Sequence, residues 1–175
     1  VVDTVLQAKG RLVVSGIGKS AVVAQKIVAT LNSTGTPSVY LHAAEAIHGD
    51  LGMILGYDVV MIISKSGESP EIKVLAQLIR NFGNPLVGMV GNTASYLARM
   101  SNYVLDTTVS QEACPNNLAP TSSTTAQMVM GDALAVALME RRGFGSNDFA
   151  KFHPGGALGK KLYLRVADLY VHNER

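Results

Sequence analysis

Short apolar runs rich in β-branched residues alternate with longer stretches of helical period along this chain of 175 residues. The apolar runs predict five strands, at residues 11–16, 38–42, 58–64, 85–91 and 102–107. The stretches between them predict helices at about 19–34, 43–49, 70–83 and 94–100. Such alternation is typical of a parallel sheet that is covered by helices on both faces. We therefore predict an α/β fold with a doubly wound five-stranded parallel sheet flanked by helices.

A polar loop, TVSQEACPNNLAPTSSTT, follows the fifth predicted strand and leads into a long helical pattern. We predict this last helix over 126–141, ended by Gly143. Its broad apolar face, which includes Leu134 and Leu138, predicts packing in the core or at a subunit interface. The tail over 149–175 is irregular around HPGGALGKK, and we expect it to wrap over the domain or over a neighbouring subunit.

Composition narrows the class of protein. Only 16% of residues are charged and the net charge is +2, so we expect no nucleic-acid partner. Cys114 is the single cysteine, which excludes an internal disulfide and a CxxC metal site and agrees with a reducing, cytoplasmic location. No apolar run approaches the ~18 residues that span a bilayer, so we expect a soluble protein without a membrane partner. We expect one domain over 1–175, although the start at Val1 indicates processing or a partial gene product.

The segment SKSGESPE (64–71) stands between the third predicted strand and the next helix. In open parallel sheets, ligands collect at the carboxyl ends of strands, where helix N-termini direct their N–H groups and positive dipole ends. Gly67 permits a tight turn, and the hydroxyls of Ser64, Ser66 and Ser69 could join helix amides around a phosphate. Alternatively, Ser69 only caps the helix and the other serines are turn residues. We favour phosphate binding.

The first loop, GIGKSA (16–21), matches two nucleotide-binding patterns poorly. A dinucleotide site requires an acidic residue after the second strand, where the chain has His42. A Walker A loop requires a glycine where the chain has Val13. What remains is Lys19 at a helix start, where contact with an anion or a developing oxyanion competes with a solvated surface lysine.

Further candidates come from the third polar loop and from two histidines. Glu112, which taken alone could equally be an exposed loop acid, precedes the hydroxyl cluster PTSSTT. In that cluster Ser122 either caps the long helix or contacts a ligand. His48 and His153 stand in IHGD and FHPGG, without a spacing that indicates a metal site. The residues alone thus predict a phosphate-binding α/β domain with Lys, Glu and His side chains for proton transfer, and they name no substrate.

Six segments taken together resemble the sugar isomerase (SIS) domain family, in the same order from about Val13 to Asp168. These segments read GIGKSA, STGTPS, HAAEAIHGDLGM, SKSGES, EACPNNLAPTSSTTAQMVMGDALAVALM and FHPGGALGKKL. The pattern SxSGE[ST] is shared by many SIS domains. EACP, LAPTSSTT and HPGGALG are more specific, and they resemble the arabinose 5-phosphate isomerases within the family.

The resemblance implies interconversion of D-arabinose 5-phosphate and D-ribulose 5-phosphate through a cis-enediol. This is an early step toward the Kdo sugar of lipopolysaccharide or capsule, and it needs no metal or organic cofactor. The family implies a homotetramer. A non-catalytic module that binds a sugar phosphate or CMP-Kdo, as a sensor or feedback site, is the alternative. Lys19, Glu112 and His153 favour the enzyme, because a sensor has no need for proton-transfer groups.

The resemblance also assigns residues. Phosphate contacts are expected from Ser64, Lys65, Ser66, Ser69 and Ser122. Catalytic residues are expected to be Lys19, His48, Glu71, Glu112 and His153. Among these we expect Glu112 to shuttle the proton, His153 to act as acid or base in ring opening, and Lys19 to contact the substrate oxygens.

Two features depart from the family. Many relatives continue into a pair of CBS domains, whereas this sequence ends at Arg175, either as a SIS-only member or because those domains were removed. Relatives also commonly carry a neutral residue where this chain has Lys65. An added cation there would tighten phosphate binding or favour a larger anionic ligand.

Overall fold

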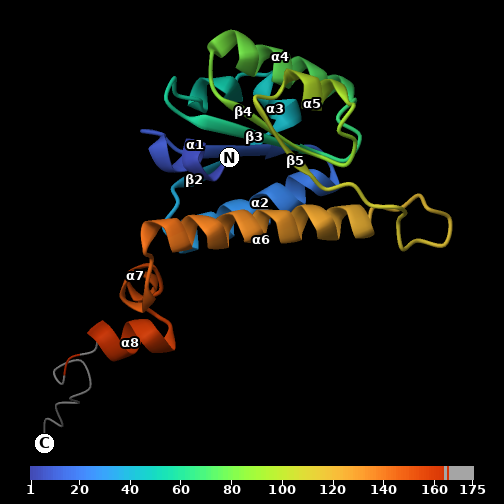
Figure 1. Cartoon of the computed structure of the whole chain (residues 1–175). Helices are drawn as coiled ribbons and strands as arrows, with labels where there is room; N and C mark the ends of the chain where they lie inside the picture. Colours follow the sequence, from blue (N-terminus) through green and yellow to red (C-terminus); the bar gives the residue numbers. More distant parts are fainter. Residues whose placement is uncertain (164, 166–175) are drawn as a thin grey trace, which may run out of the picture.

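The computed structural model describes residues 1–163 and 165, and it contains one five-stranded sheet (Figure 1). All neighbouring strands are parallel, in the order β2-β1-β3-β4-β5. The strands are β1 Leu12–Gly16, β2 Ser38–His42, β3 Val59–Ser64, β4 Leu86–Val90 and β5 Tyr103–Asp106. Each lies within two residues of its predicted position, so the predicted sheet is confirmed.

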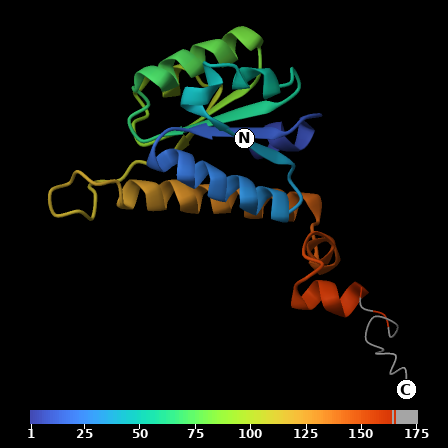
Figure 2. The same ribbon diagram turned by 180° about the vertical axis from the view of Figure 1, so that it is seen from behind.

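Helices cover both faces of the sheet (Figures 1 and 2). One face packs against the first, second and sixth helices, and the other packs against the third to fifth. In chain order the helical elements are α1 Val2–Gln7, α2 Lys19–Ser33, α3 Ala43–Ala46, η1 Asp50–Met53, α4 Pro70–Phe82, α5 Tyr96–Met100, α6 Ser122–Arg142, α7 Ser146–Phe152 and α8 Ala157–Tyr163. The doubly wound arrangement that the sequence predicts is therefore present.

Burial follows the position of each strand in the sheet. Every residue of β1, β3 and β4 is buried, whereas three of the four residues of the edge strand β5 are exposed. Strands that are covered on both faces need continuous apolar runs, which explains why these three were so evident in the sequence. The buried central strands form a rigid base for the loops at their ends.

Helices α2 and α6 lie side by side under the sheet, as the two opposite views agree (Figures 1 and 2). A Cβ atom on Gly131 would stand 2.3 Å from Ile27 Cδ1, so the two helices approach this closely only because α6 carries a glycine there. On the same two helices, Val22, Val129 and Val136 are each more than 60% exposed (66%, 61% and 61%). This pair of helices therefore presents apolar side chains to the outside.

Three predicted helix boundaries were wrong by more than one residue. The helix predicted over 43–49 ends at Ala46, because Gly49 adopts a positive φ of 129°. Helix α5 begins at Tyr96 and not at residue 94, because Ser95 occupies the N-cap and accepts a hydrogen bond from Ala98 N–H. The long helix α6 begins at Ser122, four residues before the predicted start.

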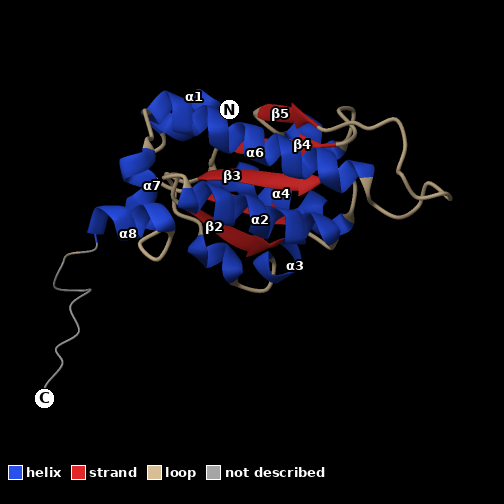
Figure 3. Cartoon of the chain, turned by 90° about the horizontal axis from the view of Figure 1, so that it is seen from below, coloured by secondary structure: helices blue, strands red, loops and turns tan. Residues whose placement is uncertain are grey.

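The chain after α6 leads away from the sheet (Figures 1 and 3). Gly143 ends α6 in the left-handed conformation, as predicted, and α7 and α8 follow at the end opposite to the 108–121 loop. Up to residue 163 the tail does not wrap over the sheet, which corrects one of the two expectations for it. The stretch LRVADLY, apart from Arg165, lies outside the described residues. Within the described residues, no helix is both long and apolar enough to cross a membrane.

Candidate functional site at the carboxyl edge of the sheet

The candidate site lies where the chain leaves two neighbouring strands toward opposite faces of the sheet. Gly16 of β1 lies beside Ile63 of β3 in the sheet register, yet the chain leaves β1 toward α2 on one face and leaves β3 toward α4 on the other. This divergence opens a crevice at the carboxyl ends, the usual ligand site of doubly wound sheets. Lys19, the first residue of α2, and the serine loop, residues 64–69, therefore lie at the same edge.

Hydrogen bonds hold the serine loop in a tight turn. Ser64 Oγ accepts a hydrogen bond from Gly67 N–H at 3.0 Å, and Ser66 Oγ accepts one from Glu68 N–H at 3.3 Å. Gly67 has a φ of +65°, and a Cβ atom on it would stand 2.3 Å from Ser95 Oγ. Only glycine fits there, as the sequence predicted, because both the backbone conformation and the close approach exclude a side chain.

Ser69 differs from an ordinary capping serine. It occupies the N-cap position of α4, but its hydroxyl accepts no capping hydrogen bond. The Oγ atom is buried and has no hydrogen-bond partner within the described residues. A buried hydroxyl without a partner costs free energy, so this atom suits an acceptor that comes from outside the chain. The first amides of α4, which no intrahelical bond can satisfy, lie beside it.

Glu112 occupies the N-terminus of the other long helix. Its side chain is fully buried, and Oε2 accepts hydrogen bonds from Thr121 N–H at 2.8 Å, Ser123 N–H at 3.1 Å and Thr121 Oγ1 at 3.2 Å. Oε1 accepts a hydrogen bond from the Ser123 hydroxyl. The carboxylate thus caps α6 from outside the helix, which explains why α6 begins at Ser122.

Lys65 joins the serine loop to this cap. Its ammonium lies 2.7 Å from Glu112 Oε1, and its side chain remains 48% exposed. The ammonium first, and then the Ser123 hydroxyl and the Thr121 amide, hold the pKa of Glu112 well below its usual range, although burial alone would raise that pKa. The sequence prediction named both residues, but it did not place them in contact. No sequence signal identifies such a pair, because the two loops meet only through the order of the strands.

The remaining predicted residues at this edge surround the crevice. Lys19 is exposed and lines a groove of about 390 Å³ between α2 and α6, together with Thr124 of the first turn of α6. Ser122 is the half-buried first residue of α6. His48 is exposed in the turn after α3, and Glu71 is the half-buried second residue of α4. Topology thus brings eight of the ten predicted site residues to one edge of the sheet. His48 stands six residues past the end of β2, on the stretch that returns to the amino edge, where the Met53 carbonyl accepts a hydrogen bond from Arg11.

His153 lies farthest from this edge. It follows α7, stacks on Phe149 with ring centroids 3.8 Å apart, and its Nδ1 lies 2.8 Å from the Phe149 carbonyl oxygen. Helix α7 follows the C-terminal end of α6, whereas Glu112 caps the N-terminal end. A helix of 21 residues is about 30 Å long, so one chain does not bring His153 to the other site residues.

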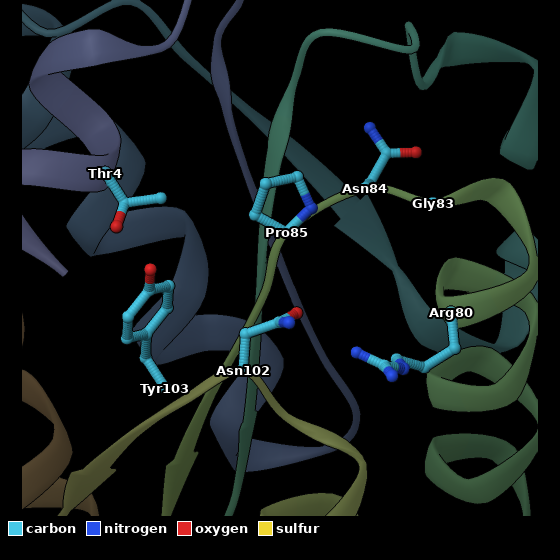
Figure 4. Close-up of a pocket in the computed structure, with 7 residues that line it drawn as sticks. All are labelled: Thr4, Arg80, Gly83, Asn84, Pro85, Asn102 and Tyr103. Atoms are coloured by element: carbon cyan, nitrogen blue, oxygen red, sulfur yellow. The ribbon is translucent and has the colours of Figure 1, made fainter.

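A pocket of about 340 Å³ lies at the opposite, amino edge of the sheet, where β4 and β5 begin (Figure 4). Its lining residues are Thr4, Arg80, Gly83, Asn84, Pro85, Asn102 and Tyr103. None of the predicted site residues lines it. We regard the carboxyl edge as the candidate site, because helix N-termini and the serine loop converge there and not around this pocket.

Comparison with known proteins supports this choice. Residues 5–137 match the SIS domain family. The chain is 56% identical over 167 residues to arabinose 5-phosphate isomerase KdsD of Pseudomonas aeruginosa, covering 95% of this chain and 51% of that protein. It is 51% identical over 173 residues to arabinose 5-phosphate isomerase KpsF of Escherichia coli CFT073, covering 99% of this chain and 53% of that protein. The chain thus spans about half the length of these curated relatives.

A solved structure is similar over most of both chains. This is an E. coli CFT073 protein in complex with arabinose 5-phosphate, with a TM-score of 0.85 and 40% sequence identity over 87% of this chain and 81% of that one. The family match covers most of the described sheet and both helical layers. This protein therefore belongs to the SIS domain family.

Proposed function

We propose that this chain catalyses the interconversion of D-arabinose 5-phosphate and D-ribulose 5-phosphate. The observation that carries the proposal is the serine loop, in which the buried Ser69 hydroxyl at the start of α4 has no partner among the described residues. Its chemistry supports phosphate binding, and the names of the curated relatives and the sugar-phosphate complex of the related structure agree with a pentose phosphate.

Phosphate binding falls to the hydroxyls of the serine loop and to the N-terminus of α4. Ser69 donates its free hydroxyl hydrogen, and Ser64 and Ser66 donate theirs while their oxygens keep the loop bonds described above. Ser122 adds a hydroxyl from the start of α6, and Lys65 adds charge. The positive end of the α4 dipole also favours a phosphate dianion at this position.

Proton transfer falls to the charged and imidazole groups around the crevice. Isomerisation removes the proton from C2 of the aldose and returns it to C1, through a cis-enediol, without net consumption of a proton. We propose Glu112 as the shuttle, Lys19 as the cation beside the developing oxyanion, and His48 and Glu71 as further polar contacts to the open-chain sugar. This chemistry requires no cofactor.

Ring opening requires a further acid or base, for which we propose His153 of a neighbouring copy. The distance along α6 prevents His153 from serving its own chain's site. The exposed side chains of Val22, Val129 and Val136 give α2 and α6 a surface suited to such contact between copies. We propose a homotetramer, and light scattering at micromolar concentration tests it, since a monomer would contradict it.

The proposal extends to the domain organisation and the pathway of this protein. We propose that residues 1–175 form one SIS domain that acts at an early step of Kdo biosynthesis, toward lipopolysaccharide or capsule. The cytoplasmic location stays a prediction from the cysteine content.

One observation favours the alternative, a non-catalytic module that binds a sugar phosphate or CMP-Kdo. Glu112 accepts hydrogen bonds on both oxygens and has a strongly lowered pKa, which makes it a weak base as it stands. A binding module would tolerate this state, whereas an enzyme must relieve it.

Incubation with arabinose 5-phosphate in deuterated water separates the two functions. Catalysis predicts ribulose 5-phosphate with deuterium at C1, together with deuterium at C2 of recovered arabinose 5-phosphate. Binding measured by calorimetry, with no label in either sugar, would instead establish the non-catalytic module.

A further inference from the structure

The two oxygens of the Glu112 carboxylate have different partners. Oε2 accepts from the backbone N–H groups of Thr121 and Ser123 and from the Thr121 hydroxyl, all of which belong to the start of α6. Within residues 1–163 and 165, the partners of Oε1 are all side-chain groups, the Ser123 hydroxyl and the Lys65 ammonium. Removing Lys65 from Oε1 would therefore leave the backbone cap of α6 intact.

The Lys65 ammonium can move away from Glu112. Within the described part of the chain, its Nζ forms one ion pair, the one with Glu112, and about half of its side chain is exposed (48%). Its backbone is fixed, because its carbonyl oxygen accepts a hydrogen bond from Gly91 N–H at 3.0 Å. The ammonium thus sits on a flexible four-carbon chain attached to a rigid loop.

A phosphate on the serine loop would compete directly for this ammonium. Lys65 stands between Ser64 and Ser66, so a ligand held by these serines lies next to the backbone of Lys65 itself. A phosphate near neutral pH carries close to two negative charges, whereas Glu112 carries one that the α6 amides already stabilise. The ammonium is therefore expected to move from the carboxylate to the phosphate.

We infer that Lys65 is a positioning residue that couples phosphate binding to the release of Glu112 Oε1 for proton transfer. This inference rests on the proposed function, and it assigns to Lys65 a role that a phosphate contact alone does not require. Before substrate binds, Lys65 keeps Glu112 charged and paired. Once the phosphate takes the ammonium, Oε1 accepts the C2 proton and returns it to C1.

The charged groups around Glu112 agree with this role. Lys65 is its ion-pair partner from the serine loop, and the groups from α6 that contact it are neutral. Several other ionisable groups lie at this edge, and among the described residues none of them forms a hydrogen bond or ion pair with Glu112: Lys19, His42, Glu68, Glu71 and Asp106. Because the Lys65 ammonium is the largest cause of the lowered pKa of Glu112, its departure raises that pKa.

The direct test is a titration of the Glu112 side-chain carboxyl by carbon-13 NMR, with and without saturating sulfate. Sulfate has the shape of phosphate and keeps both charges in the acid range where Glu112 titrates, whereas phosphate takes up a proton below about pH 6. In the wild type, we expect sulfate to raise the midpoint by at least about one pH unit. In Lys65→Met the midpoint is already raised without sulfate, and sulfate raises it less than in the wild type. An unchanged wild-type midpoint, or equal sulfate effects in both proteins, would overturn the inference.

Matched variants exclude a merely structural effect. Lys73→Met removes another half-exposed lysine, which pairs with Glu68 at 2.7 Å, and we expect it to leave the Glu112 midpoint unchanged. Lys65→Arg keeps the charge, and we expect it to restore the effect of sulfate on the Glu112 midpoint. A midpoint that shifts equally in Lys73→Met would also overturn the inference.

Steady-state kinetics give a second, independent readout. We expect Lys65→Met to raise KM about tenfold, through the lost charged contact to phosphate, and to change kcat less than threefold. A large loss of kcat at unchanged KM would contradict the coupling. If the wild type shows no isomerisation in deuterated water, the proposed function fails, but the sulfate titration of Glu112 still decides whether Lys65 moves.

Discussion

Two buried carboxylates at opposite edges of the sheet are built alike but differ in their cations. Asp58, just before β3, has no exposed side-chain surface and accepts hydrogen bonds from Arg11 N–H at 2.7 Å and Leu55 N–H at 3.0 Å. Glu112, after β5, is equally buried and accepts two backbone amides of its own. Each also pairs with one partly exposed cation.

The cations of the two pairs, Arg11 and Lys65, differ in how many protein groups hold them. The Arg11 guanidinium binds Asp58 at 3.0 Å and also donates to the Met53 carbonyl at 2.7 Å, so a second protein group fixes it. The Lys65 ammonium has Glu112 as its one ion-pair partner among the described residues. A planar guanidinium that is held twice forms a static link, whereas a singly held ammonium can exchange partners. A buried carboxylate paired with a cation thus stabilises the fold at the amino edge and, as proposed, takes part in proton transfer at the carboxyl edge.

Buried polar atoms without a partner occur at both edges, but more of them lie toward the carboxyl ends of the strands. At the amino edge, the Asn84 amide nitrogen donates to the carbonyl oxygens of Leu55 and Asp58, which ties the loop before β3 to the loop before β4. Among the described residues, Arg11 Nε and Thr36 Oγ1 lack a partner at this edge. Toward the carboxyl ends, the atoms without a partner in the described chain are Ser15 Oγ, His42 Nδ1, Ser69 Oγ and Thr107 Oγ1. Such atoms are costly in a purely structural region and are expected near a ligand site.

The largest expected effect is on turnover in Glu112→Gln. The amide cannot take up the C2 proton, so we expect the rate of isomerisation to fall about 10²- to 10⁴-fold. Exchange of substrate hydrogen with deuterated water measures the step directly. Glu140→Gln, an exposed change near the far end of α6, is the control and should keep full turnover. Near-normal exchange in Glu112→Gln would assign the shuttle to another residue.

The next effect is on stability, in Asp58→Asn. Loss of the charge leaves Arg11 without its anion at a buried site, so we expect the free energy of unfolding to fall by about 3 kcal/mol. Thermal unfolding should show a Tm that is lower by about 10 °C. Asp3→Asn breaks the exposed pair with Arg141 and should cost less than about 1 kcal/mol. Equal losses in the two variants would contradict a stabilising role for the buried pair.

Ser69→Ala and Ser95→Ala compare two N-cap serines with opposite expected effects. The Ser95 hydroxyl caps α5, so its loss should cost about 1 kcal/mol of stability with little change in KM. The Ser69 hydroxyl has no protein partner among the described residues, so its loss should leave stability unchanged and raise KM about tenfold. Calorimetry and initial rates measure the two quantities. A stability loss in Ser69→Ala with unchanged KM would make it an ordinary cap.

The smallest effect is the pH dependence of the Asp58 pair. Burial raises the pKa of Asp58, but the hydrogen bonds and charge of Arg11 outweigh burial and lower the pKa overall. The stability from this lowering is complete above the unfolded pKa of about 3.9 and is lost as the pH falls through the folded pKa. The Tm difference between wild type and Asp58→Asn should therefore be constant from about pH 5 to 8 and shrink below about pH 4. A difference that grows at acidic pH would reverse the sign.

The sequence predicted the sheet because its signals are local. Buried central strands such as Val59–Ser64 require continuous apolar runs, and glycines such as Gly67 and Gly143 mark turns that few other residues adopt. The start of α6 was missed because its capping group, Glu112, lies outside the helix and well before it in sequence. Cap rules that look for a neighbouring hydroxyl cannot find a carboxylate supplied by a distant part of a loop.

The sequence predicted which residues gather at the candidate site, but it did not predict the contacts between them. Parallel topology alone sends the residues after β1, β2, β3 and β5 to one edge, so their gathering follows from the order of the elements. The pairing of Lys65 with Glu112 depends on side-chain reach between two loops, for which the sequence carries no periodic signal. The position of His153 depends on the length and direction of α6, and a motif match ignores both.

Helix α6 fixes the distance between two parts of the proposed site. Its first turn belongs to the crevice around Glu112, and its last turn carries the segment that bears His153. In an assembly where His153 completes a neighbour's crevice, this single rod would set the spacing between consecutive reaction centres at about 30 Å. Adding or removing one helical turn would then misalign every centre of the assembly at once, while each subunit kept its own fold.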